Sequence, residues 1–330
     1  MKYDIRLFEQ LNKEYKPKPL KTLFPQYDPD SQLKIARSRI ATLNKLVSLK
    51  GARILVIGCG LGYLSSVLAS ECNCRVIGID LRKRAEWDLL KTKSPNLDYQ
   101  AVDLSSENPF DMESFDLIVS FWTWEHVIHP FTLLRECCKV LKPSGAIYID
   151  ATPYRSPCGS HRYREVFFPF PHLLFEDEVF SEYYVKHTGK GITSERLNKL
   201  TYSQYKEYFR ILNLRIEHEE LVKIPLDKDF YNRFKDKLER YPIFDLELDC
   251  FRVLLRKPEQ AALQEALVEQ NKLKSDLETV RNSFSFRLGH TLVQAVRWPG
   301  RNTVFLPYRL VRLCVIEFKK QKTKETRKVE

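Results

Sequence analysis

The chain has 330 residues, of which 43% are hydrophobic and 29% charged, and its formal net charge is +11 at pH 7. This composition is that of an ordinary soluble globular protein, and the length leaves room for one large α/β domain with an appendage or for two domains. No run of about 18 apolar residues occurs, which excludes a membrane-spanning helix, and the opening residues MKYDIRLFEQ lack the apolar core of a secretory signal.

The positive charge is concentrated at one end of the chain. Residues 281–330 contain 12 Lys or Arg and 3 Asp or Glu, so residues 1–280 are nearly neutral. A basic tail on a neutral body predicts an anionic partner at the tail and disfavours a nucleic-acid cleft in the body.

Eight cysteines are scattered along the chain. Cys72 and Cys74 have a single residue between them, which is too few for the usual zinc knuckle, and no matching pair follows. We therefore predict reduced thiols in a cytosolic protein, and no metal site.

Residues 1–50 are polar and charged, and we interpret them as an N-terminal helical cap. The spacing predicts a helix over 31–49, with Leu33, Ile40 and Leu43 on one side. From residue 51, short apolar runs alternate with helical stretches, which is typical of a parallel sheet with crossover helices. The runs are 54–57, 75–79, 99–102, 117–121 and 146–149, and two later strand candidates are 214–221 and 250–255.

These elements predict an α/β domain over residues 51–258, with a Rossmann-like, doubly wound, mostly parallel seven-stranded sheet and a C-terminal helical extension. An aromatic insertion, residues 151–245, lies inside this domain. It forms either a lid that excludes water from a bound ligand, or the core of a small subdomain or dimer surface. Its densest part contains Tyr163, Phe167, Phe168, Phe170, Phe175, Phe180, Tyr183 and Tyr184.

Residues 259–285 consist of helix formers with apolar residues at heptad positions, and Gln270 is the one polar a position. Three heptads are short for a coiled coil, so the segment predicts a weak homo-oligomerising helix or a spacer. Residues 286–330 form a basic amphipathic tail, with charged residues on one side of a helical projection over 309–320. Such a tail lies on an anionic membrane surface or docks on protein.

Three glycines fall within five residues, between the strand 54–57 and a helix that begins near Tyr63. This places backbone amides at a helix N-terminus, where they can face an anion or a polar ligand. Gly58 permits the sharp turn, Gly60 leaves room for a ligand, and Gly62 lets the helix pack closely on the strand. A purely structural turn usually needs only one glycine, so the loop predicts a ligand site.

Two kinds of ligand use such a loop. A dinucleotide prefers G-x-G-x-x-G, but the position of the last glycine is occupied by Tyr63. Asp80 ends the second strand, where a carboxylate can accept from both ribose hydroxyls of NAD or of S-adenosylmethionine. The loop spacing favours S-adenosylmethionine, and so does Asp103 after the third strand, where it could accept from the adenine amino group.

Five motifs occur in register over about a hundred residues: the glycine loop, Asp80, AVDL (101–104), FDLIVSFWTWEHVIHP (115–130) and RECCKVLKPSGAIYI (135–149). In these motifs the sequence resembles the class I S-adenosylmethionine-dependent methyltransferases, specifically the small-molecule branch that includes quinone-biosynthesis methyltransferases. The resemblance covers residues 35–150 closely and extends more loosely to Lys257. It implies S-adenosyl-L-methionine as the cofactor.

The resemblance also implies a cofactor site. The glycine loop would line the methionine part, Asp80 would hold the ribose, and the residues after the second, third and fourth strands would lie near the adenine or the active site. The implied set is Gly58, Cys59, Gly60, Gly62, Asp80, Leu81, Asp103, Leu104, Phe121 and Trp122. The family commonly has an acidic residue two positions before the first glycine, where this chain has Val56. Residues 143–145 would form the turn before the fifth strand.

Methyl transfer to a hydroxyl also requires a base. The candidates are Glu125 and His126, after the fourth strand, and His161, after the fifth, with His129 as a further possibility. His126 could instead orient the helix that follows it, and His161 could be an ordinary loop histidine. We interpret His172 as structural.

We therefore predict a cytosolic enzyme that methylates an oxygen of a small-molecule, glycan or lipid-linked acceptor, in cell-surface polysaccharide synthesis and peripherally bound to the inner membrane face. The competing hypothesis is a catalytically inactive scaffold that recruits partners or membrane through its C-terminal helices. A quinone methyltransferase is a further alternative. A nucleic-acid methyltransferase is disfavoured, because residues 120–123 read SFWT where amino-methylating DNA enzymes have an Asn/Asp-Pro-Pro-aromatic turn.

Overall fold

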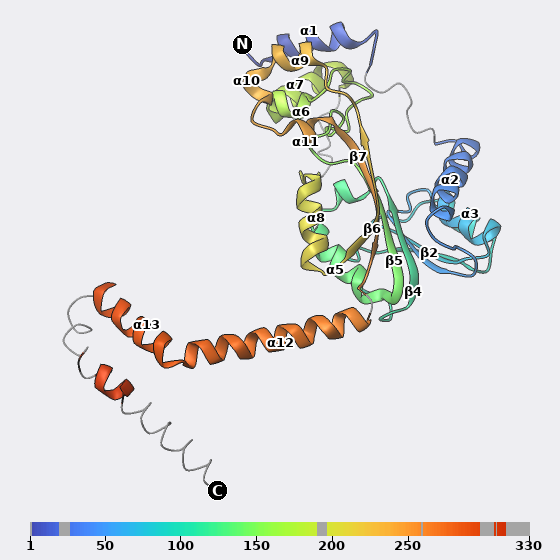
Figure 1. Cartoon of the computed structure of the whole chain (residues 1–330). Helices are drawn as coiled ribbons and strands as arrows, with labels where there is room; N and C mark the ends of the chain where they lie inside the picture. The colour runs from blue at the N-terminus through green and yellow to red at the C-terminus, as the bar shows by residue number, and fades with distance from the viewer. Residues whose placement is uncertain are drawn as a thin grey trace. The chain divides into compact units, whose positions relative to one another are not determined.

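A seven-stranded sheet runs through the first of the two units into which the chain divides, Met1–Pro258 and Glu259–Glu330. The computed structural model describes residues 2–19, 27–189, 197–258, 260–297, 307 and 309–314. The strand order is β3-β2-β1-β4-β5-β7-β6, with β1 to β5 parallel and β7 antiparallel to both β5 and β6 (Figure 1). This confirms the predicted sheet. The strands are β1 (Arg53–Ile57), β2 (Arg75–Asp80), β3 (Leu97–Ala101), β4 (Phe115–Phe121), β5 (Leu141–Ala151), β6 (Arg215–Lys223) and β7 (Leu248–Arg256).

The predicted turn at residues 143–145 is placed differently. Strand β5 already begins at Leu141, and its pairing with β4 jumps from Leu141 opposite Phe115 to Ala146 opposite Leu117. The Pro-Ser-Gly segment is therefore an irregularity inside β5 rather than a turn before it, because the chain keeps its pairing partner on both sides.

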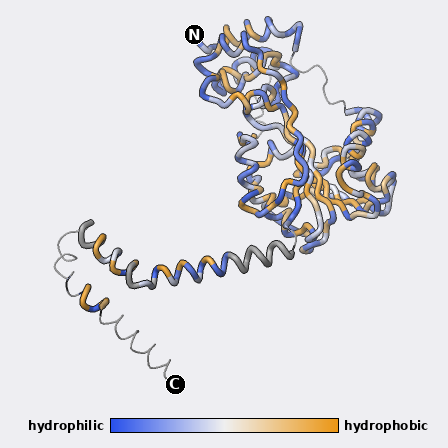
Figure 2. The backbone as a smooth tube through the Cα atoms, in the orientation of Figure 1, coloured by the Kyte–Doolittle hydropathy of each residue, from blue (hydrophilic) through white to orange (hydrophobic). Residues whose placement is uncertain are grey.

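Helices cover both faces of the sheet (Figure 1). One face shares a buried core, which includes Val56, with α2 (Pro29–Asn44), α3 (Tyr63–Glu71) and α4 (Glu86–Lys91). The other face shares a core, which includes Leu55 and Ile57, with α5 (Pro130–Val140) and α8 (Tyr202–Ile211). Alternate residues of β1 thus serve opposite cores, and Figure 2 shows the strands as the most hydrophobic part of this unit. The sheet is doubly wound, as predicted.

Local sequence sets where several helices begin. Asp28 accepts from the amide of Ser31 at the start of α2, and Pro29 follows at the first helical position. Thr201 and Gln204 form a reciprocal capping box at the start of α8.

An aromatic cap, which is not the predicted helical cap of residues 1–50, is built from segments far apart in the sequence. It contains α1 (Ile5–Tyr15), α6 (Pro171–Leu174), α7 (Asp177–Thr188), α9 (Lys228–Arg233), α10 (Lys235–Leu238) and α11 (Ile243–Glu247). The chain enters the cap after β5, leaves it for α8 and β6, and returns through α9 to α11 before β7, so the cap adjoins the carboxyl end of β5 (Figure 1). Six of the eight predicted aromatic residues lie in its core with Phe8 of α1, which is 0% exposed, whereas the ring of Tyr163 lies 6.5 Å from that of His161.

The second unit contains α12 (Gln260–Asn282) and α13 (Phe284–Arg297). Helix α12 falls within the predicted heptad segment, and the described residues 309–314 are also helical. Most of the rest of the predicted tail, including 315–330, lies outside the described residues. In the described part of the chain, no helix has both the length and the apolar character that a bilayer crossing requires.

Candidate active site

The predicted site residues gather at the carboxyl edge of the sheet. Strand order reverses between β1 and β4, and ligands in open α/β sheets bind in the crevice at such a reversal. Strand β1 leads into the glycine loop, β2 ends at Asp80, and β4 leads into the short 3-10 helix η1 (Trp124–His126). Register aligns these ends, since Ile57 pairs with Ile79 on one side and with Ser120 on the other.

The glycine loop requires its glycines for different reasons. Gly58, Gly60 and Gly62 all have positive φ, at +67°, +53° and +91°. A Cβ on Gly58 would come within 2.2 Å of Thr123 Oγ1, and one on Gly62 within 2.7 Å of the Tyr99 hydroxyl, whereas one on Gly60 would meet no atom within 4 Å. Gly58 and Gly62 are thus closed in by the protein, and Gly60 faces open space.

Three side chains hold the loop in place. Trp87 Nε1 donates to the carbonyl of Gly60 at 2.8 Å, and the Tyr99 hydroxyl donates to the carbonyl of Gly62 at 2.6 Å. The two rings stack with their centroids 5.1 Å apart. The amide of Gly60 donates to Asp80 Oδ2 at 2.9 Å, so the carboxylate at the end of β2 is oriented by the loop itself. The loop is therefore rigid before any ligand binds.

Aromatic residues and a cation mark the end of β4. Trp122 is 49% exposed and has a φ of +51°, a strained conformation for a bulky residue, and its amide donates to the carbonyl of Asp150 at 2.7 Å. The Arg39 guanidinium of α2 lies over the Phe121 ring at 4.6 Å and over the Trp122 ring at 5.2 Å. Burial lowers the pKa of Arg39, and the nearby carboxyl of Asp150 counters this effect.

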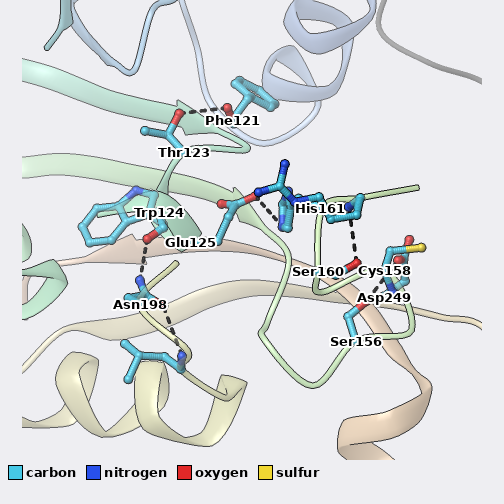
Figure 3. A network of polar contacts seen from close by, with 12 residues as sticks. Phe121, Thr123, Trp124, Glu125, Ser156, Cys158, Ser160, His161, Asn198 and Asp249 are labelled. Carbon is cyan, nitrogen blue, oxygen red and sulfur yellow. Dashed lines mark hydrogen bonds and ion pairs between the residues drawn. The ribbon is translucent and has the colours of Figure 1, made fainter. Parts of the chain in front are cut away.

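Glu125, His126 and His161 come together although His161 is 35 residues further along the chain. Glu125 is 3% exposed, and its Oε1 lies 4.0 Å from Nε2 of His161 (Figure 3). The rings of His126 and His161 meet edge to face with centroids 4.9 Å apart. His161 has a φ of +54°, a strained conformation like that of Trp122.

The same three side chains could hold a divalent cation. One ligand atom of each lies within 4.8 Å of the others, and two imidazoles with a carboxylate suit a borderline metal such as zinc. The sequence predicts no metal site, because the cysteine spacing does not fit zinc and each of these three residues is a candidate base when taken alone.

Asn198, which sequence reasoning missed, fixes the turn that carries Glu125. Its Nδ2 donates to the carbonyl of Trp124 at 2.6 Å (Figure 3). The same nitrogen donates to the Tyr205 hydroxyl at 2.9 Å, and the backbone amide of Asn198 donates to the carbonyl of Glu125 at 2.9 Å. Arg39, Trp87 and Tyr99 were also missed. None of the four belongs to a motif with a recognisable spacing.

The remaining predicted residues lie in contrasting environments. Leu81 is 68% exposed beside Asp80, whereas Leu104 is buried in the core. Asp103 Oδ1 accepts from the amide and the hydroxyl of Ser105, so this carboxylate already stabilises a local turn. Burial raises the pKa of the Cys59 thiol, which keeps it neutral and unreactive. The contacts of these residues with a cofactor remain predictions.

Residues 55–149 match the family model described as a methyltransferase domain. They contain the glycine loop, Asp80 and the end of β4. This part of the chain is similar to methyltransferase domains.

Curated relatives carry the same kind of name. The ubiquinone biosynthesis O-methyltransferase of Dechloromonas aromatica is 29% identical over 229 residues, which cover 65% of this chain and 88% of that protein. The protein of the same name from Xanthomonas campestris pv. campestris is 38% identical over 118 residues, or 34% of this chain and 47% of that protein. The chain spans about half the length of several curated relatives that it matches.

A solved structure is also similar to this chain. It is phosphoethanolamine N-methyltransferase 2 of Haemonchus contortus in complex with phosphomonomethylethanolamine and S-adenosylhomocysteine. The similarity has a TM-score of 0.47 at 19% identity and covers 68% of this chain and 53% of that chain.

The cofactor that the sequence resemblance implies is S-adenosylmethionine, and the residues present fit it. The open side of Gly60 leaves the backbone accessible beside the carboxylate of Asp80, which a ribose diol needs as an acceptor. Arg39 places a cation at the same sheet edge, where it suits a carboxylate such as that of the methionyl group. Val56 is 3% exposed within the core, so an apolar side chain fits the position at which the family commonly has an acid.

Proposed function

We propose that this chain transfers a methyl group from S-adenosylmethionine to an oxygen of a non-protein acceptor. One observation supports this above all: a ligand-accessible glycine, the Asp80 carboxylate and the Glu125–His161 pair occur at a single edge of the sheet. A cofactor site and a proton acceptor are the two parts that methylation of a hydroxyl requires.

In this proposal His161 is the base. When bound, S-adenosylmethionine supplies an electrophilic methyl group. The acceptor hydroxyl loses its proton to a ring nitrogen of His161 as the oxygen–carbon bond forms and the carbon–sulfur bond breaks. The buried carboxylate of Glu125, 4.0 Å from Nε2, favours the protonated imidazole electrostatically. Trp122 offers an exposed ring to the acceptor at the end of β4.

The acceptor that we favour is a glycan or lipid-linked precursor at the inner face of a membrane, in cell-surface polysaccharide synthesis. The aromatic cap beside β5 supports an acceptor with apolar surface or sugar rings, for which the cap would act as a lid that excludes water. A quinone precursor is the second candidate, because the relatives' names refer to ubiquinone biosynthesis.

Calorimetry with S-adenosylhomocysteine tests the cofactor site. We expect the wild type to bind and Asp80→Asn to bind at least about 10-fold more weakly, since the variant loses a charged acceptor for the ribose. Asp88→Asn is the matched control, because Asp88 forms only an exposed pair with Lys83. Failure of the wild type to bind, or equal binding by Asp80→Asn, would refute the site.

Turnover tests the reaction and the base. Methyl incorporation from labelled S-adenosylmethionine should occur in a lysate that contains the natural acceptor and should fall about 100-fold or more in His161→Gln. Absence of turnover despite cofactor binding would favour the inactive scaffold instead. If a chelator abolished turnover and a divalent cation restored it, the Glu125–His126–His161 cluster would be a metal site and not a base.

Membrane association is part of the same proposal. Helix α13 exposes Phe286, Leu292 and Val293 on a strongly basic segment. Deletion of residues 286–330 should abolish sedimentation with anionic liposomes and leave S-adenosylhomocysteine binding intact. Neutral liposomes serve as the control, and continued pelleting of the shortened chain with anionic vesicles would exclude the tail as the anchor.

A further inference from the structure

Helix α12 exposes an apolar stripe. Leu273, Leu277 and Val280 are 63%, 60% and 54% exposed, and every residue from 270 to 281 is exposed. The spacing of four and then three residues places the three side chains on one side of the helix, and Figure 2 shows hydrophobic and hydrophilic residues alternating there. An apolar stripe of this kind is the seam of a coiled coil.

Charged residues flank this stripe in a regular pattern. With Leu273 and Val280 at d and Leu277 at a, Lys274 and Arg281 occupy e positions and Asp276 occupies a g position. Glu269 occupies the preceding g position by the same spacing. Among the described residues, Lys274, Asp276 and Arg281 form no ion pair within the chain. Arg281 also borders a hollow with Phe286 and His290 but remains exposed.

We infer that α12 pairs with α12 of a second copy of this chain, as a parallel, in-register, two-stranded coiled coil. In that arrangement each g residue faces the e residue five positions later on the other helix. Glu269 then meets Lys274 and Asp276 meets Arg281, twice each by symmetry. The inference is independent of the proposed function.

The charges exclude the antiparallel alternative. Antiparallel helices bring g beside g and e beside e, which would set Asp276 against acidic groups and Lys274 or Arg281 against basic ones. Gln270, which is exposed at an a position, also favours the parallel arrangement. Its amide meets an identical amide only when the two helices are in register.

Sedimentation velocity of the full chain tests the pairing. We expect the wild type, at tens of micromolar, to sediment with twice the chain mass of 39.0 kDa. Lys274→Glu/Arg281→Glu makes the four charged e and g positions (269, 274, 276 and 281) all acidic and should shift the protein to the monomer. Adding Glu269→Lys/Asp276→Lys restores complementary pairs with the signs reversed and should restore the dimer.

This four-residue variant is the control for helix loss, because it contains the same two e-position changes. A monomeric wild type, a dimer that persists in the two-residue variant, or a trimer would each overturn the inference. Orientation is tested with Val280→Cys under mild oxidation, compared with the wild type. Parallel helices place the two new thiols side by side and give a disulfide-linked dimer, whereas a dimer that stays uncrosslinked would contradict the parallel register.

Discussion

The three loop glycines are equivalent in the sequence but not in the structure. Gly60 opens to space that a ligand can enter, whereas Gly58 and Gly62 contact Thr123 and Tyr99. A side chain at position 60 should therefore interfere with ligand binding, whereas a side chain at position 58 or 62 should interfere with folding.

Gly60→Ala should cost about 1 kcal/mol of stability, the strain of a positive φ, and should weaken S-adenosylhomocysteine binding severely. Gly62→Ala should cost roughly 2 to 4 kcal/mol, because its Cβ also collides with the Tyr99 ring. Chemical denaturation and calorimetry on both variants measure the two effects. Equal stability losses, or unimpaired binding by Gly60→Ala, would contradict the distinction.

His172 is structural in this fold, as its sequence context indicated. Its pKa is lowered to about 4, chiefly because burial disfavours the charged ring. The neutral ring donates from Nε2 to the carbonyl of Tyr154 at 2.6 Å, and the buried Nδ1 has no hydrogen-bond partner among the described residues. A second proton would thus have no acceptor.

This histidine should make the protein acid-sensitive. Below its ordinary pKa of 6.5 the unfolded chain binds a proton that the folded chain does not bind. The free energy of unfolding should therefore fall as the pH drops from 6.5 to about 4, by up to roughly 3 kcal/mol. His172→Gln should be less stable than the wild type at pH 7.5 but should show a flatter decline. Urea unfolding across this pH range measures both, and parallel declines would exclude His172 as the cause.

At the scale of elements, η1 depends on a segment that lies about seventy residues away. Asn198 donates to the backbone carbonyls of Trp124 and Glu125 and thereby holds the turn from which the Glu125 side chain extends. We expect Asn198→Ala to lower turnover roughly 10- to 100-fold, because a small displacement of a catalytic group is costly. Binding of S-adenosylhomocysteine should remain unchanged, since the glycine loop has its own supports.

Asn198→Asp is the matched variant for this position. It keeps the side-chain oxygen that accepts from the amide of Leu200 but loses the donor to Trp124. Turnover should fall as far as in the alanine variant. Full activity in Asn198→Asp would show that the Nδ2 hydrogen bonds do not position Glu125.

The elements that could be predicted from the sequence are those with a periodic signal. A run was predicted for each of the seven strands; the central strands are buried and need continuous apolar residues, and the sheet edge then follows from topology. Asn198 and Arg39 were not predicted, because their roles depend on contacts between remote segments, which no local spacing records. Helix α1 was missed within the polar N-terminal segment, although Asp4 caps it and Phe8 and Leu11 lie on one face.

At the scale of the whole molecule, α1 joins the first residues of the chain to the cap. Phe8 contacts the rings of Phe168, Phe175 and Phe180 at centroid distances of 5.1, 5.0 and 5.2 Å. Asn12 donates to the carbonyl of Glu165 at 2.8 Å. The cap core is therefore incomplete without the N-terminal segment.

Phe8→Ala should lower the free energy of unfolding by about 3 to 5 kcal/mol, because it empties a fully buried aromatic site. Denaturant unfolding followed by tyrosine fluorescence measures the loss. Leu7→Ala is the control, since Leu7 is only partly buried beside the same core. A similar cost for both variants would contradict the central position of Phe8.

The place of α1 also bears on how the protein is made. This helix leaves the ribosome before its partners in α7, α9 and α10, which follow more than 150 residues later. Until they emerge, the nascent chain displays Phe8 and Leu11 with nothing to cover them, the kind of exposure that invites chaperones or misassembly. The yield of active protein should consequently depend on synthesis speed and on chaperone supply.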